Sequence, residues 1–186
     1  MVPSIQSPTK FMSLSMLLIS IIMMVCEVNG QLLPPSQRTI VLYLQDIAQG
    51  PNATVAPVIG LRGKDWSFNT FGTIFVVGDP LTLNPSPSST TVGWAQGLLV
   101  ATAHDGANVN VVLSIVFNNL EFKGSSLQLQ GISNQRENDK EVSVVSGTGM
   151  FRFARGFASF HTIIYDPDLA HSVIRLTINL RQTIEN

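Results

Sequence analysis

The chain has 186 residues, with 11 basic and 12 acidic side chains, a net charge of −1 and 45% hydrophobic residues. This charge balance excludes the broad basic surface on which nucleic-acid binding depends, so we expect no nucleic-acid partner. The length indicates one globular domain.

The first element is an apolar run from Phe11 to Cys26, preceded by Lys10 and followed by small residues up to Gly30. It is shorter than the roughly 20 residues of a membrane-spanning helix. The pattern predicts a secretory signal peptide over residues 1–30 and a mature domain over 31–186. The alternative is an uncleaved membrane anchor. Secretion to the extracellular space follows from the first interpretation.

The rest of the chain consists of short runs of β-branched and aromatic residues separated by Gly, Pro, Asn, Asp and Ser. Eight strands are predicted, in chain order: 39–47, 71–77, 93–101, 110–117, 124–131, 141–146, 150–162 and 172–184. The second is expected to end at the turn Gly78-Asp79-Pro80. Residues 84–91 and 132–140 are expected to be long polar loops.

Even strand spacing without room for crossover helices favours an all-β fold, an eight-stranded antiparallel up-and-down β-barrel, because closure removes exposed sheet edges. A barrel of this size can hold one small ligand in a central cavity. A two-sheet sandwich with a solid core is the alternative, and periodicity does not separate the two.

Two patterns bear on modification and metals. The sequon Asn52-Ala53-Thr54 predicts glycosylation of Asn52. His104, His161 and His171 lack a ligand spacing, and the one cysteine, Cys26, lies in the signal peptide. We therefore expect no metal site and no cofactor.

The predicted strand 150–162 carries the most distinctive face. Arg152, Ala154 and Gly156 alternate on it, so that one cation stands beside small residues. This is typical of a ligand pocket with a fixed cationic donor. The alternative is that small residues permit tight barrel packing and Arg152 lies in water at the rim.

Two carboxylates are candidate acids. Asp46 shares an apolar strand face with Leu42 and Leu44, where burial would raise its pKa and a nearby Arg152 would lower it. Glu141 begins the strand before Gly147-Thr148-Gly149, and a hairpin around this turn would place it opposite 151–153. Such groups could protonate a quinone methide. The alternatives are a turn-bonding Asp46 and a solvated Glu141.

Four motifs then resemble one family. VLYLQDI, FGTIFVVGDPLT, VGWAQGLLV and VVSGTGMFRFARGFA resemble, in order, the conserved blocks of plant dirigent proteins, and cover about 40–180. The resemblance implies a secreted barrel of the apoplast or cell wall, assembled as a homo-oligomer, with a trimer favoured over a dimer.

The function implied is non-oxidative. A separate laccase or peroxidase makes phenoxy radicals of monolignols such as coniferyl alcohol, and the dirigent protein directs the stereochemistry of their coupling into lignans. Two alternatives are a quinone methide dehydratase or cyclase resembling pterocarpan synthase, and a structural protein of lignin deposition.

Residue by residue, the resemblance implies that Asp46, Glu141 and Arg152 are catalytic and that Leu99, Ala154 and Gly156 line the substrate pocket. Leu99 stands where the family commonly has tyrosine, which predicts a more apolar pocket wall.

Overall fold

The computed structural model describes residues 36–119 and 121–182, so the predicted signal peptide over 1–30 lies outside the described residues. Nine strands follow one another in the described part: β1 (Ser36–Ile47), β2 (Val55–Ile59), β3 (Ile74–Thr82), β4 (Thr91–Ala101), β5 (Asn108–Phe117), β6 (Ser126–Asn134), β7 (Asp139–Thr148), β8 (Arg155–Asp166) and β9 (His171–Gln182). A single 3₁₀ turn, η1 (Gly149–Phe151), lies between β7 and β8. Among these residues, no helix has the length and hydrophobicity needed to cross a membrane.

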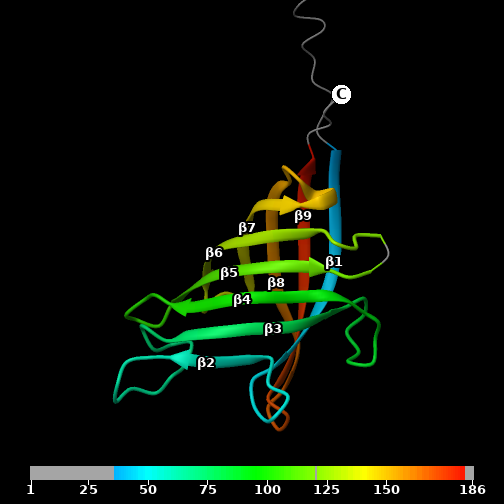
Figure 1. The fold of residues 1–186 in the computed structure, drawn as a ribbon. Coiled ribbons are helices and arrows are strands. Elements are labelled where there is room, and N and C mark those ends of the chain that lie inside the picture. Colours follow the sequence, from blue (N-terminus) through cyan, green and yellow to red (C-terminus); the bar gives the residue numbers. More distant parts are fainter. Residues whose placement is uncertain (1–35, 120, 183–186) are drawn as a thin grey trace, which may run out of the picture. The chain divides into compact units, whose positions relative to one another are not determined.

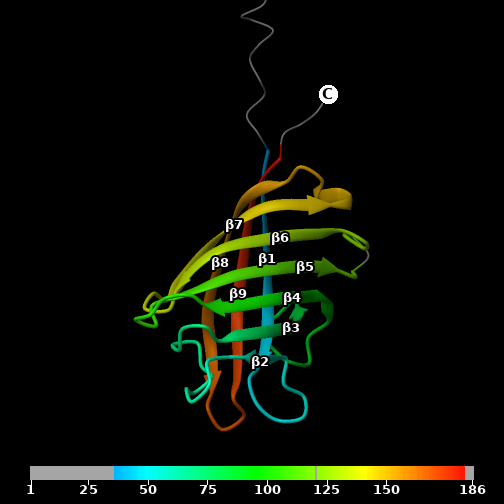
Figure 2. The same ribbon diagram turned by 60° about the vertical axis from the view of Figure 1, so that its left-hand side comes forward.

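Eight of the strands close into the predicted antiparallel barrel. Neighbours along the chain pair from β3 to β9, and β1 pairs along its whole length with β9 (Figure 1). The barrel closes where β1 also meets β3, through Tyr43 with Thr82 and Leu44 with Leu81. Figure 2 shows β1 crossing behind β3 to β6 beside β9. The ninth strand, β2, was not predicted, and it occupies the other half of the same β3 edge.

Alternation of side chains explains the closure. Along β5, every second residue from Val109 to Phe117 is buried, and the residues between them are exposed or partly exposed. Apolar side chains therefore line the inside of the barrel. The outer face is mixed, because Asn110 and Ser114 alternate there with Val112 and Val116.

The two ends of the barrel differ. At the end where β1 begins, the rings of Phe117, Phe122 and Phe151 pack with centroids 5.1–5.2 Å apart, and Arg38 lies over Phe122 at 4.6 Å. Burial of three aromatic side chains makes this end a solid core. The opposite end is hollow and contains the candidate site.

Several predicted boundaries were wrong. β3 continues through Gly78-Asp79-Pro80 to Thr82 instead of ending before them, and the supposed loop 132–140 is mostly strand, because β6 extends to Asn134 and β7 begins at Asp139. In turn, the predicted strand at Met150 begins only at Arg155. These differences decide which side chains face the hollow end.

Candidate functional site

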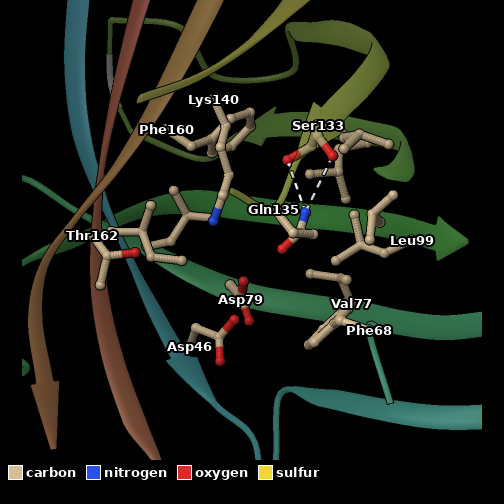
Figure 3. Close-up of a pocket in the computed structure, with 15 residues that line it drawn as sticks. Asp46, Phe68, Val77, Asp79, Leu99, Ser133, Gln135, Lys140, Phe160 and Thr162 are labelled. Atoms are coloured by element: carbon tan, nitrogen blue, oxygen red, sulfur yellow. Dashed lines mark hydrogen bonds between the residues drawn. The ribbon is translucent and has the colours of Figure 1, made fainter. Parts of the chain in front are cut away.

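A pocket of about 160 Å³ lies inside the barrel at the end where β1 finishes. Its wall is mainly apolar, with Leu44, Val77, Leu99, Val111, Phe160 and Ile174 among its lining residues. The polar groups are few: Figure 3 shows Asp46 and Asp79 on one side and Ser133, Gln135 and Lys140 on the other, and Thr162 adds a hydroxyl group to the lining. An apolar cavity with a small number of convergent polar groups is the usual form of a small-molecule site.

The two carboxyl groups come from neighbouring strands at the barrel's closing edge. Asp46 follows the inward-facing Leu44 on β1, and Asp79 follows the inward-facing Val77 on β3. The antiparallel register that pairs Leu44 with Leu81, continued by two residues, places Asp46 opposite Asp79. Both side chains therefore reach the cavity at the same level.

Burial makes both carboxyl groups weaker acids. It raises the pKa of Asp46 to about 6, although the charge of His171 opposes the rise. The pKa of Asp79 is raised to about 8, first by burial and then by the charge of Asp46, with Thr54 lowering it in part. One oxygen of Asp79, Oδ1, is buried and has no hydrogen-bond partner among the described residues. Near pH 7 the pair can therefore hold one proton, on Asp79, beside an ionised Asp46.

A buried polar network supports Asp46 from outside the barrel. The Gln45 side chain is buried and donates to Thr82 Oγ1 at 2.9 Å and to the Pro85 carbonyl at 3.2 Å. Its Oε1 lies 3.1 Å from Nε2 of His171. These bonds tie β1, the loop after β3 and β9 together directly behind the acid.

The opposite wall is formed by the β6–β7 hairpin. Gln135 donates from Nε2 to the Ser133 carbonyl at 3.3 Å and lies 3.1 Å from Ser133 Oγ. Lys140 contributes the positive charge in the pocket lining. The site can thus offer proton transfer at one wall and hydrogen-bond donation at the other.

Comparison with known proteins identifies the family. The sequence profile described as Dirigent-like protein matches residues 37–181. The chain belongs to the dirigent family. Dirigent protein 1 of Arabidopsis thaliana is 37% identical over 116 residues, which are 62% of this chain and 64% of the relative. Pterocarpan synthase 1 of Glycyrrhiza echinata is 35% identical over 117 residues, which are 62% of each chain.

A solved structure supports the same assignment. A pterocarpan synthase dirigent protein superimposes with a TM-score of 0.72 and 29% identity, over 81% of this chain and 97% of that one. The chain spans less than two thirds of the length of these two curated relatives.

The residues expected from the dirigent resemblance fall into two groups. Asp46 and Leu99 line the pocket. Glu141 does not: it is exposed and pairs across the strands with Ser159, whereas we expected it opposite 151–153. The inward-facing residue at this point of β7 is its neighbour, Lys140.

Arg152, Ala154 and Gly156 lie at the other end of the barrel. Arg152 is exposed directly after Phe151 of the aromatic cluster. Ala154 is buried in the core, and a Cβ on Gly156 would overlap the carbonyl oxygen of Asn179 on β9. The small residues here permit close packing, and the structure does not bring Arg152 together with Asp46 or Glu141.

Asp79 is the acidic pocket residue that the sequence interpretation missed, and Ser133, Gln135 and Lys140 on the opposite wall were missed as well. Gly78-Asp79-Pro80 has the composition of a turn, and that composition hid the alternation of Phe75, Val77, Asp79 and Leu81. Proline fits this strand because pairing with β1 is incomplete there. The sequence did contain a signal for it: Asp79 stands at every second position with the apolar residues Val77 and Leu81, which indicates a side chain that faces inward.

The sequon residue Asn52 and the three histidines are not among the residues that line the pocket. No group of three or more His, Cys, Asp or Glu side chains in 36–119 and 121–182 is arranged to hold a metal ion. Asn52 is exposed in the turn between β1 and β2, on the rim of a second, outer hollow that also includes Gln45 and His171. Its glycosylation stays a prediction.

Proposed function

We propose that this dirigent protein is a non-oxidative stereodirecting protein of phenylpropanoid chemistry. It binds a phenolic intermediate made by a separate laccase or peroxidase and fixes the face on which the next bond forms. The observation that carries the proposal is the pair of carboxyl groups, Asp46 and Asp79, in an otherwise apolar pocket.

The pocket supports a role at the quinone methide stage. Neutral Asp79 donates its proton to the quinone methide oxygen, which becomes a phenol as the exocyclic carbon becomes electrophilic. A hydroxyl group of the ligand adds to that carbon, and ionised Asp46 accepts the proton that the hydroxyl releases. After the step the proton is on Asp46 instead of Asp79, and its transfer back to Asp79 restores the starting state. No oxidant is consumed at this step.

The apolar wall supplies the stereochemical control. A cavity of about 160 Å³ is smaller than the roughly 300 Å³ at which drug-sized ligand pockets begin, which favours one aromatic unit held in a fixed orientation. Holding the ring against one wall exposes one face of the electrophilic carbon to the nucleophile. Leu99 in this wall makes contact with the ring without adding a polar group.

The test is chiral chromatography of the products formed from coniferyl alcohol with a trace of laccase, with and without the secreted protein. An enantiomeric excess that requires both proteins supports stereodirected coupling. A racemic product with the wild-type protein, under conditions where it binds the alcohol, contradicts it.

A dehydratase is the second candidate. The carboxyl pair also suits loss of water from an alcohol precursor, with Asp79 protonating the departing hydroxyl and Asp46 accepting the phenol proton. The relatives named pterocarpan synthase favour this candidate. Turnover of such an alcohol without any oxidant would distinguish it from the first.

Secretion to the apoplast, glycosylation at Asn52 and assembly as a homo-oligomer belong to the same proposal. They would be checked by the N-terminal sequence of the exported protein, by its mass before and after glycosidase treatment, and by light scattering.

A further inference from the structure

Lys140 occupies an inward position on β7. The alternation on this strand buries Val142 and Val144 and exposes Glu141 and Ser143, which puts Lys140 on the inner face. It is partly buried and lines the pocket. Figure 3 shows its Nζ directed into the cavity.

The ammonium group has no partner within the described part of the protein: neither a hydrogen bond nor an ion pair joins it to another side chain there. The neighbouring ionisable groups are used elsewhere, because Asp139 pairs with His161 at 2.7 Å. A buried or half-buried cation without a partner keeps its full capacity to bind an anion.

The cavity between the two walls is apolar. Val77, Leu99 and Phe160 are part of the apolar lining, and on the β6–β7 side the amide nitrogen of Gln135 already donates to Ser133, which leaves Lys140 as the donor for a ligand (Figure 3). A ligand that fills this space has an aromatic body and polar groups at both ends. Below pH 6, protonation of the carboxyl groups leaves Lys140 as the charge that dominates the lining.

We propose that Lys140 is a specificity-determining residue that binds an anionic oxygen of the ligand, so that the site prefers a phenylpropanoid carrying a carboxylate over the matching alcohol. This inference rests on the proposed function, because it assumes a phenolic ligand with its reacting end at Asp46 and Asp79. It goes further in naming the class of ligand.

Isothermal titration calorimetry at pH 5.5, below the pKa values of Asp46 and Asp79, with ferulic acid and coniferyl alcohol tests the inference. The two probes share their ring and chain length and differ at the terminal carbon, carboxylate against hydroxymethyl. We expect the wild-type protein to bind ferulate about tenfold more tightly than the alcohol, the effect of one charge-assisted hydrogen bond. Lys140→Met should lower the ferulate affinity about tenfold and change the alcohol affinity less than about twofold.

Two further variants control for charge and folding. Lys123→Met removes a positive charge from the exposed loop between β5 and β6, and should leave both affinities unchanged. Lys140→Arg keeps the charge and should keep the preference for ferulate. Circular dichroism would confirm that each variant retains the β-rich fold.

The outcomes separate the two proposals. Equal affinities in the wild-type protein, or a ferulate preference that survives in Lys140→Met, would overturn the role of Lys140 and leave the proposed function standing. Binding of neither probe would overturn the phenolic ligand itself, and with it the inference that depends on it.

Discussion

At the scale of single residues, the carboxyl pair determines what the pocket can do. An apolar cavity alone would orient a ligand without chemistry, whereas Asp46 and Asp79 place a proton donor and a proton acceptor at the same level of the barrel. Their different pKa values come from their different surroundings: Asp79 faces the charge of Asp46, and Asp46 faces that of His171. One carboxyl group is thus protonated where the other is ionised.

The first prediction concerns the pH dependence of turnover. If ionised Asp46 accepts a proton and neutral Asp79 donates one, the rate of quinone methide cyclisation should be bell-shaped, with limbs near pH 6 and pH 8. Asp79→Asn should lower the rate by a factor of about 100 and remove the alkaline limb. Steady-state rates from pH 4 to pH 9 provide the measurement, and an unchanged profile in Asp79→Asn would exclude the residue as the donor.

The second prediction concerns stability. Because the folded-state pKa of Asp79 lies above its unfolded value of 3.8, the folded chain keeps a proton between about pH 4 and pH 8 that the unfolded chain has lost. Its contribution to the free energy of unfolding is therefore greatest at low pH and falls as pH rises through this window. Asp79→Asn should increase the stability relative to wild type by a few kcal/mol at pH 8 and much less at pH 4.

Urea unfolding at both pH values measures this difference. Asp65→Asn, on the exposed loop between β2 and β3, is the matched control and should change the stability equally at both pH values. A constant offset between Asp79→Asn and the wild-type protein would show that Asp79 is not perturbed by burial.

At the scale of the elements, small residues in β8 hold strands together. Gly156 pairs with Leu180 of β9, and a Cβ there would overlap the backbone oxygen of Asn179. Since this oxygen belongs to the backbone of the paired strands β8 and β9, it can move only if these two strands separate. Gly78 in β3 has open space around its Cβ position.

The third prediction compares these two glycines. Gly156→Ala should lower the free energy of unfolding by about 2 kcal/mol through overpacking, whereas Gly78→Ala should change it by less than about 1 kcal/mol in either direction. Thermal and urea denaturation would show the difference. Equal effects would mean that β8 and β9 can adjust, and that Gly156 was not selected for close approach.

The elements also show how far the sequence could lead. Alternating apolar residues predicted the eight barrel strands, and Asp46 could be identified because it continues the alternation of Leu42 and Leu44. The hairpin formed by β7 and β8 was predicted, but its register was not, because η1 lies between the two strands and Glu141 pairs with Ser159 instead of 151–153. Alternation within β7 buries Val142 and Val144, so it directs Glu141 outward and Lys140 inward. Glu141 was proposed for the pocket from its expected place opposite 151–153 and from the dirigent resemblance, and neither reveals which way its side chain faces.

At the scale of the whole molecule, the site lies at the weakest point of the barrel's closure. β1 is paired with β9 from end to end, but it meets β3 only through Tyr43 with Thr82 and Leu44 with Leu81. Beyond these pairs Thr54 lies between the two strands: its backbone N–H donates to the Ile47 carbonyl and its carbonyl accepts from Gly78, each at 2.8 Å, next to Asp46 and Asp79 in the chain. We call this short β1–β3 contact the seam of the barrel. If it opened, water would reach both carboxyl groups.

Thr82 is the residue that holds this seam from outside, and the fourth prediction tests it. Its hydroxyl accepts a hydrogen bond from buried Gln45 and donates to the Asn84 carbonyl at 2.8 Å. Thr82→Val preserves the shape but leaves the Gln45 amide one acceptor short, which should cost about 1–3 kcal/mol. Thr39→Val, which removes an exposed hydrogen bond from β1 to Asn179 on β9, should cost less than about 1 kcal/mol.

Hydrogen–deuterium exchange locates the effect. In Thr82→Val, the backbone amides of β1 around Tyr43 and Leu44 should exchange faster, while those of the β5–β6 pair keep their protection, because only the seam has lost a bond. Wider opening hydrates Asp79, so its pKa should move down toward the ordinary value and the alkaline limb of the rate profile should move with it. Faster exchange without that movement would show that burial of Asp79 depends on the pocket wall rather than on closure of the barrel.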